Sequence, residues 1–269
     1  MRFLKRSRND LSPDILIAVL VMLTVADVGL ILALVRSHHS YFERQRNSVA
    51  WEYWRVNETR SSELPTSGTV LITGFEPFMR GPVNASWEAV KNLDGEQLGG
   101  FTLKVARLRV VWGSPKEQLD ELVRDSGAVA VFSFGQGHPG EMALETRAQR
   151  ERGNGRDNLG IPGAGGITDD GPDLHHTRYD AESVRTKLRA KGWPVRVSTD
   201  AGQYLCEENL YVLMELERIA KVQVTGFCHL PPLGTMMEDG RVADADLLGA
   251  FVRELVKVRL GVEEASQAR

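Results

Sequence analysis

The sequence predicts an α/β domain, with helices on the faces of a β-sheet, preceded by one N-terminal transmembrane helix. From Thr69 onward, short β-rich runs alternate with helical patterns, which is the order typical of this fold class. Upstream, Ile15–Val35 is an almost unbroken apolar stretch. The chain has 269 residues, of which 42% are hydrophobic, enough for one α/β core and an appendage. Its formal net charge of -3 gives no indication of nucleic-acid binding and favours a small molecule or peptide as partner.

The apolar run Ile15–Val35 is long enough to cross a bilayer. At about 1.5 Å per residue, a helix of this length matches a hydrocarbon thickness of about 30 Å. Asp27 opposes insertion by about 2.5–3.5 kcal/mol, but the surrounding Leu, Ile and Val side chains outweigh this cost. The run exceeds the apolar region of a signal peptide, about 7–15 residues, and a small-residue cleavage site does not follow it. We therefore expect an uncleaved anchor rather than a cleaved signal.

The flanks of this segment divide the chain and orient it. The basic flank 1–14 favours an N-terminus in the cytoplasm and a folded domain on the far side of the membrane. Residues 36–67 are polar, with aromatic residues near the membrane side, and predict a juxtamembrane stalk and linker. The α/β domain is expected over 68–262, followed by a tail over 263–269. The alternative is that the apolar run is not an anchor and the protein is cytosolic.

Local signals justify the elements of the domain. Ser114, Pro115 and Glu117 predict a helix start, because serine caps free amides, proline suits the first turn and the glutamate completes a capping box. Gly192 predicts the end of a later helix. Residues 150–173 are dense in glycine and charge, so we expect an irregular loop that covers the site. The expected strands are 69–75, 102–112, 128–135, 195–200 and 221–227, and the expected helices are 86–93, 114–125, 180–192, 208–220 and 244–261.

Cys206 and His229 are the candidate catalytic pair. Cys206 lies between a strand and a helix, where the positive helix start lowers a thiol pKa and can hold an oxyanion. His229 lies at the C-terminal end of the next strand, the edge of an α/β sheet where reacting groups gather. A thiolate with a histidine as proton donor is the minimum for covalent acyl transfer, and a third group usually orients the imidazole. The competing interpretation is a small buried cysteine and a structural histidine.

Four motifs resemble the pyroglutamyl peptidase I (pyrrolidone-carboxylate peptidase) family of cysteine peptidases. They are GFEPFMRGPVNASWEAV at 74–90, GQ at 135–136, DAGQYLC at 200–206 and FCHLP at 227–231, and the resemblance covers residues 69–260. It implies a three-layer α/β/α sandwich with a mixed, mostly parallel sheet. It also implies removal of N-terminal pyroglutamate from peptides through a thioester intermediate, without a cofactor, by a homo-oligomer.

The resemblance implies a catalytic triad. It makes Cys206 the nucleophile, His229 the general acid/base and Glu145 the acidic residue that orients the imidazole. Aligning Glu145 requires a one-residue deletion upstream, so Glu141 and Glu151 stay open as alternatives for the third member.

The same resemblance implies a pocket for the pyroglutamyl ring. Phe75 and Phe78 match aromatic positions that hold the flat ring, whereas Asn84 and Gln136 match polar positions that line its pocket. A five-membered lactam has apolar methylenes, one NH and one carbonyl, so its recognition needs stacking surface and a few hydrogen-bond partners. For the two phenylalanines, ordinary core packing is the alternative.

The chain departs from the family beside these motifs. Glu207 and Glu208 follow the nucleophile, and their carboxylates are expected to oppose thiolate formation and partly cancel the effect of the helix start. An amidase or peptidase of altered specificity and a catalytically silent peptide-binding domain therefore stay open as alternatives. The other departures are Met79-Arg80 in place of a glycine pair, Arg150 in place of an asparagine, Glu207 itself in place of an asparagine, and the absence of an arginine shortly after the GQ motif.

The second cysteine and the histidine pairs bear on a disulfide and on a metal site. An oxidising compartment favours a disulfide between Cys228 and Cys206, but alternation along a strand directs Cys228 and His229 to opposite faces, which argues against it. The histidine pairs at 38–39 and 175–176 lack partners at the spacing of a zinc site, so we expect no metal and place these side chains in solvent.

Overall fold

The computed structural model describes residues 64–79 and 81–262. The predicted transmembrane segment Ile15–Val35, its basic flank, nearly all of the stalk and the tail lie outside the described residues. Among the described residues, no helix is both long and apolar enough to cross a membrane.

A seven-stranded sheet forms the centre of the domain, with the strand order β2-β3-β1-β4-β9-β5-β8. β2 is antiparallel to β3, and β5 is antiparallel to β9, while the other four pairs of neighbours are parallel. The mixed, mostly parallel sheet that the resemblance implies is thus confirmed. The strands are β1 Gly68–Phe75, β2 Gln97–Leu98, β3 Phe101–Leu108, β4 Ala130–Gln136, β5 Met142–Glu145, β8 Val195–Ser198 and β9 Val224–Leu230.

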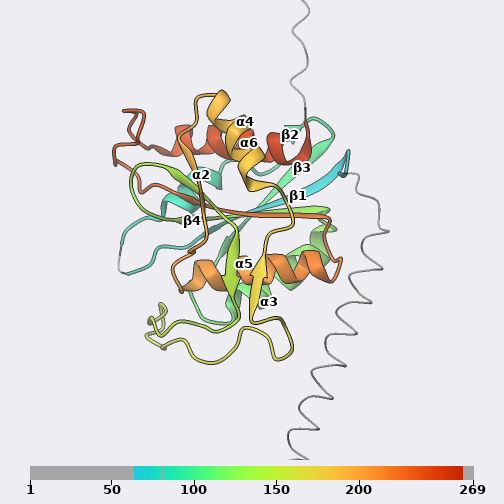
Figure 1. Ribbon diagram of the computed structural model, residues 1–269, viewed down its shortest axis with the longest axis vertical. Coiled ribbons are helices and arrows are strands. Elements are labelled where there is room, and N and C mark those ends of the chain that lie inside the picture. The colour runs from blue at the N-terminus through green and yellow to red at the C-terminus, as the bar shows by residue number, and fades with distance from the viewer. Residues whose placement is uncertain (1–63, 80, 263–269) are drawn as a thin grey trace, which may run out of the picture. The chain divides into compact units, whose positions relative to one another are not determined.

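Helices cover both faces of this sheet (Figure 1), α2, α4 and α6 on one face and α3 and α5 on the other. Alternating side chains supply one apolar core for each face: Val70 and Ile72 of β1 lie in the core under α6, whereas Leu71 lies in the core against α5. The three-layer sandwich is therefore confirmed. The helices are α2 Ala85–Val90, α3 Ser114–Ser126, α4 Ala181–Ala190, α5 Leu205–Arg218 and α6 Ala245–Leu260.

The start of α3 differs from the capping box predicted on Ser114 and Glu117. The N-cap is Gly113, in a left-handed conformation with φ 84°, and Ser114 is already helical. The Ser114 hydroxyl donates to the Gln118 side chain, so it does not cap the helix. The Gly113 amide instead donates to the carboxylate of Glu208, 95 residues away in sequence. Local pattern could not reveal this partner because α5 supplies it.

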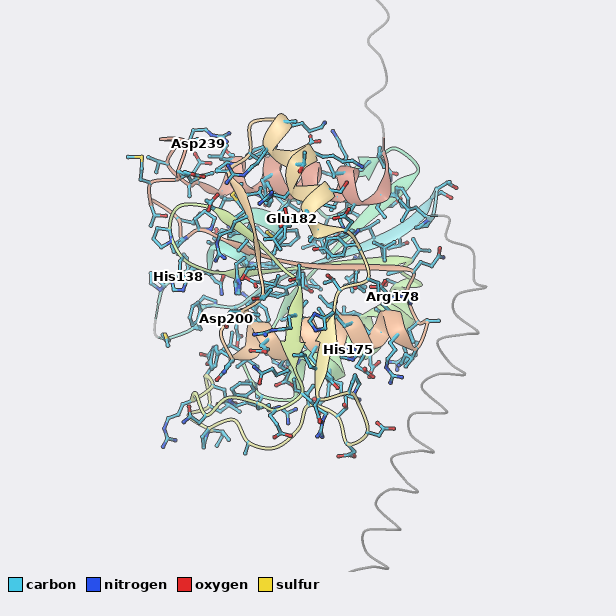
Figure 2. All side chains as sticks on the ribbon, viewed as in Figure 1. His138, His175, Arg178, Glu182, Asp200 and Asp239 are labelled. Carbon is cyan, nitrogen blue, oxygen red and sulfur yellow. The ribbon has the colours of Figure 1, made fainter. Side chains whose placement is uncertain are left out.

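Residues 150–173 form the irregular loop that the sequence predicts, apart from isolated bridges, and it lies below α3 and α5 in Figure 1. The loop is flanked by a two-stranded sheet of β6 Arg147–Gln149 and β7 Leu174–His176, which the sequence analysis missed. The expectation that the pair 175–176 is solvated is wrong for His175, which is buried against α5 (Figure 2) and contacts the Glu215 carboxylate and the Tyr211 ring.

One buried ion pair fastens the loop to the domain. The Arg152 guanidinium donates Nε to Glu208 Oε2 at 2.9 Å and Nη2 to Glu208 Oε1 at 3.1 Å. The Glu208 side chain is 0% exposed and that of Arg152 is 15% exposed, so water screens this pair little. Because α5 carries both Glu208 and Cys206, the anchor of the loop is one turn or less from the candidate nucleophile.

We predict that Glu208→Ala destabilises the protein by about 3 kcal/mol, because the change leaves the Arg152 charge buried without its partner. Urea denaturation of the full chain measures this loss. Glu121→Ala is the matched control, since Glu121 is an exposed glutamate of the neighbouring helix α3 and its removal should change stability by no more than about 0.5 kcal/mol. Equal stability of the two variants would contradict an anchoring role for the pair.

Candidate active site

A pocket of about 360 Å³ opens at the C-terminal ends of β1, β4 and β9 and at the start of α5. This is the edge where open α/β sheets gather their ligands. Six of the seven residues singled out from the sequence line the pocket, and the seventh, Glu145, lies behind His229 and is buried. The six are Phe75, Phe78, Asn84, Gln136, Cys206 and His229.

Strand pairing brings Glu145 to His229. β5 runs antiparallel to β9 with Ala143 opposite His229, and Glu145 lies two residues further along β5 on the same face. The His229 Nδ1 atom is 2.9 Å from Glu145 Oε1, and this hydrogen bond fixes the orientation of the imidazole ring. The alternatives for the third member lie elsewhere: Glu141 is paired with Arg189, and Glu151 is near Arg150.

A glycine allows the thiol to approach the imidazole. Gly135 of β4 is in register with His229, and an added Cβ there would lie 2.7 Å from Cys206 Sγ and 3.0 Å from His229 Cδ2. The sulfur and the ring therefore share the space above one bare backbone position. The Cys206 side chain hydrogen-bonds the His229 ring, and since Nδ1 faces Glu145, Nε2 is the nitrogen left for the sulfur.

The charges and hydrogen bonds of Cys206 and Glu145 favour a charged imidazole at His229. Burial alone would lower the pKa of His229, but the negative charge and hydrogen bond of Cys206, followed by the hydrogen bond and charge of Glu145, raise that pKa to about 10. The histidine is therefore an imidazolium over the whole neutral range when the sulfur is ionised. This thiolate–imidazolium pair is the form that a cysteine nucleophile requires.

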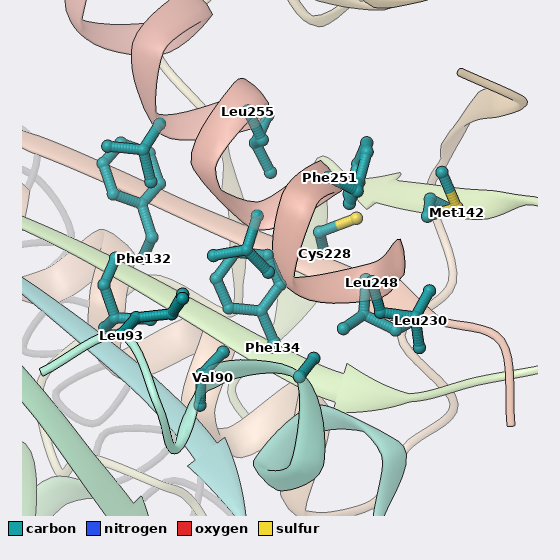
Figure 3. Close-up of a cluster of buried hydrophobic side chains, with 14 of the residues drawn as sticks. Val90, Leu93, Phe132, Phe134, Met142, Cys228, Leu230, Leu248, Phe251 and Leu255 are labelled. Atoms are coloured by element: carbon teal, nitrogen blue, oxygen red, sulfur yellow. The ribbon is translucent and has the colours of Figure 1, made fainter. Parts of the chain in front are cut away.

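Cys228 lies on the opposite side of the sheet. It is fully buried in the core under α6, where Figure 3 shows it among Phe251 and Leu248. Burial, together with the charge of Glu145, raises the pKa of its thiol well above the ordinary value. Cys206 packs against the other core, so the placement of Cys228 and His229 on opposite faces that strand alternation predicts is confirmed, and both cysteines are free.

The carboxylates that follow Cys206 are already bonded elsewhere. Glu207 accepts hydrogen bonds from the backbone amides of Gln149 and Gln203, both at 2.8 Å. Glu208 accepts from the Gly113 amide and pairs with Arg152. Donors of the surrounding loops therefore hold both carboxylates, two amides for Glu207 and one amide with a guanidinium for Glu208. The expectation that these carboxylates oppose thiolate formation stays a prediction.

The remaining pocket walls are aromatic and amide groups. Phe78 and Tyr204 have ring centroids 6.5 Å apart, and Trp112 supports Tyr204 in an edge-on contact at 5.4 Å. Asn84 caps α2 by accepting from the Ser86 amide, and Gln136 Oε1 accepts from the amide of Ala85. Within residues 64–79 and 81–262, the Gln136 Nε2 atom makes no hydrogen bond, so its two donors are available to a ligand in the pocket.

Sequence reasoning missed several residues of the pocket. Tyr204 stands two residues before Cys206 inside a motif already singled out, so its aromatic ring was a signal that could have been used. Val110, His138 and Arg196 gave no such signal, because their positions depend on strand order and register. Met79, noted only as a departure from the family, lines the mouth and is 82% exposed.

Comparison with known proteins agrees with this geometry. The family model for pyroglutamyl peptidase matches residues 68–267. A pyrrolidone-carboxylate peptidase of Cupriavidus taiwanensis is 36% identical over 172 residues, covering 61% of this chain and 79% of that protein, and one from Ralstonia nicotianae is 36% identical over 169 residues with the same coverage.

Two solved structures have the same fold. The pyroglutamyl peptidase I of Bacillus amyloliquefaciens superimposes with a TM-score of 0.65 at 25% identity, covering 73% of this chain and 98% of that one. The pyrrolidone carboxyl peptidase of Thermococcus litoralis gives a TM-score of 0.65 at 23% identity, over 72% of this chain and 94% of that one, and this supports the fold alone. On the match of the family model and the curated relatives, the chain belongs to the pyroglutamyl peptidase family of cysteine peptidases.

Proposed function

We propose that the protein removes N-terminal pyroglutamate from peptides, with Cys206 as nucleophile, His229 as general acid/base and Glu145 as the residue that orients the imidazole. The observation that carries the proposal is the continuous contact from Glu145 through His229 to Cys206 at the wall of a ligand-sized pocket. Membership of the pyroglutamyl peptidase family supports the choice of substrate.

The reaction divides into two acyl transfers. The Cys206 thiolate attacks the pyroglutamyl carbonyl carbon, a C–S bond forms, and the carbonyl oxygen takes the negative charge. The backbone amides of Leu205 and Cys206 at the start of α5 are the donors for this oxyanion, since those of Glu207 and Glu208 already donate to the Tyr204 carbonyl. When the C–N bond breaks, the His229 imidazolium gives its proton to the leaving amine, and a thioester remains. His229 then takes a proton from water, which attacks the thioester and releases pyroglutamate and the thiol.

The pocket provides what a lactam ring needs. Phe78 and Tyr204 offer aromatic surface for its methylenes, whereas Phe75, which also lines the pocket, is 2% exposed and packs in the core as its alternative interpretation expects. The free Nε2 donors of Gln136 suit the lactam carbonyl, while the bonded Oε1 keeps the amide from turning over. Asn84 holds the segment between β1 and α2 in place, because its side chain caps α2 and donates to the Glu76 carbonyl.

One observation favours the alternative of a related amidase with altered specificity. Met79 holds a left-handed backbone with φ 52° and presents an exposed side chain at the pocket mouth, where the family resemblance gives glycine. Such a side chain changes what the mouth accepts without touching the Cys206–His229 pair. The alternative of a catalytically silent domain rests on Glu207 and Glu208, which donors of the loops hold in place, and on the departures from the family at other positions.

We also propose that Ile15–Val35 anchors the protein in a membrane, on the length and apolarity of that segment alone. The homo-oligomer that the resemblance implies stays a prediction.

Cys206→Ala is expected to lower kcat/KM for a chromogenic pyroglutamyl amide by at least about a thousandfold, because no other group can form the acyl intermediate. The matched control is Cys228→Ala, which removes the second cysteine from the opposite core and should retain activity at a stability cost of about 1 kcal/mol. Turnover by the Cys206→Ala variant at the rate of the unaltered protein would exclude the mechanism.

The pH dependence of alkylation tests the ion pair. The pKa of His229 lies above its ordinary value, so the stabilising imidazolium is fully present below about pH 6.5 and is lost as pH rises through about 10. Cys206 should therefore react with iodoacetamide rapidly at pH 7. In His229→Ala, which lacks the imidazolium, the reaction at pH 7 should be slower. Peptide mapping separates Cys206 from the buried Cys228, and superimposable profiles for the two proteins would refute the pair.

Cell fractionation tests the anchor. The full chain should remain in the membrane pellet after a high-salt or carbonate wash, because burial of an apolar helix of this length does not depend on salt. A variant lacking residues 1–63 should appear in the soluble fraction. Release of the full chain by the wash would mean that Ile15–Val35 does not span the bilayer.

A further inference from the structure

Three neighbouring strands carry one row of side chains that ends at an arginine. Ala143 of β5 pairs with His229 of β9 on one side and with Arg196 of β8 on the other. Residues directly opposite one another in a sheet point to the same face, so Arg196 shares the face of His229. With strands about 4.8 Å apart, its Cα lies roughly 10 Å from that of His229.

The residue between them leaves room for a ligand. Ala143 contributes only a methyl group, and both His229 and Arg196 line the pocket on either side of it. β8 is the edge strand of the sheet, and Arg196 is exposed there. An arginine side chain is long and flexible enough to extend its guanidinium across part of this interval.

The Arg196 guanidinium has no ion-pair partner among the residues that the structure describes. Among the described residues, this guanidinium also forms no hydrogen bond. Its charge acts at a distance on Cys228 and on Glu141, which is itself paired with Arg189, and in both cases it is the last of the causes. The pocket also contains one exposed carboxylate, Asp200, but this group accepts a hydrogen bond from the Gly202 amide in the turn that precedes α5. Arg196 is therefore the unengaged cation beyond His229.

The chemistry of the site defines which part of the substrate lies there. This step rests on the proposed function: the lactam ring occupies the aromatic end near Phe75 and Phe78, and His229 protonates the leaving amine. The residue that leaves must then extend from His229 away from the ring, along the row toward Arg196. Its α-carboxylate, when the substrate is a dipeptide, is two bonds from the protonated nitrogen.

We propose that Arg196 binds a carboxylate on the leaving residue, so that the enzyme prefers pyroglutamyl peptides whose second residue is anionic. Guanidinium and carboxylate form paired hydrogen bonds with matching geometry. The carboxylate has two sources, the free C-terminus of a pyroglutamyl dipeptide and the side chain of an acidic second residue.

Two matched pairs of substrates separate these sources. Pyroglutamyl-alanine and pyroglutamyl-alanine amide differ only in the C-terminal charge, while pyroglutamyl-aspartate amide and pyroglutamyl-asparagine amide differ only in the side chain. For the full-length protein at low salt, we expect kcat/KM to be roughly two- to fivefold higher for the charged member of at least one pair. The pair that responds identifies the carboxylate, and the ratio should fall toward one at high salt.

Variants assign the preference to Arg196. Arg196→Gln should bring the ratio within the responding pair close to one, and Arg196→Lys should retain part of it, because lysine keeps the charge without the paired geometry. Arg178→Gln is the matched control: Arg178 is exposed, does not line the pocket, and lies at the opposite side of Figure 2 from the pocket residue His138. This control should leave both ratios at the values of the unaltered protein.

The outcomes distinguish this inference from the proposed function. Cleavage of all four substrates with no preference for charge, or a preference that survives in Arg196→Gln, would overturn the role of Arg196 and leave the peptidase activity standing. If none of the four is cleaved while other N-terminal groups are removed, the pyroglutamyl specificity itself is wrong.

Discussion

The site depends on the hydrogen bond between His229 and Glu145. This bond crosses the single antiparallel junction, β9 to β5, inside an otherwise parallel part of the sheet. It turns the imidazole so that its other nitrogen faces Cys206, and the bare backbone of Gly135 lets the sulfur approach. Without this fixed ring, the Cys206 charge would not lie against the imidazole, and the rise in the His229 pKa that this charge causes would be lost.

A second layer of buried charge holds the surroundings of this bond. Glu207, which follows the nucleophile on α5, accepts hydrogen bonds from the backbone amides of Gln149 and Gln203. The next residue, Glu208, binds the guanidinium of Arg152. Carboxylates at the start of a helix also complement the helix dipole. The two carboxylates beside the nucleophile are thus structural anchors, since each is held by donors of the surrounding loops.

The sequence predicts well whatever depends on local pattern or on a quoted motif. The long alternating strands and amphipathic helices were recognised, and six chosen residues meet in one pocket. The sequence does not predict β5, because its four residues MALE are too short to display a period. Without β5, its antiparallel pairing with β9, which brings Glu145 to His229, could not be predicted either. The position of Arg196 beside the pocket depends on the register between β5 and β8. At the start of α3, the Glu208 carboxylate of α5 accepts from the Gly113 amide in place of the expected serine cap. Such long-range partners leave no trace in a local window of sequence.

Charge is managed differently at the two ends of the pocket. At the catalytic end, the ion pair of His229 with Glu145 lies between the buried strands β9 and β5. At the outer end, Arg196 is exposed on the edge strand β8. An NMR titration of the His229 ring tests the charged imidazole at the catalytic end most directly. We predict that the ring signals keep their imidazolium positions from pH 6 to 9 and move only near pH 10. Titration near pH 6.5, as in an ordinary histidine, would contradict the account.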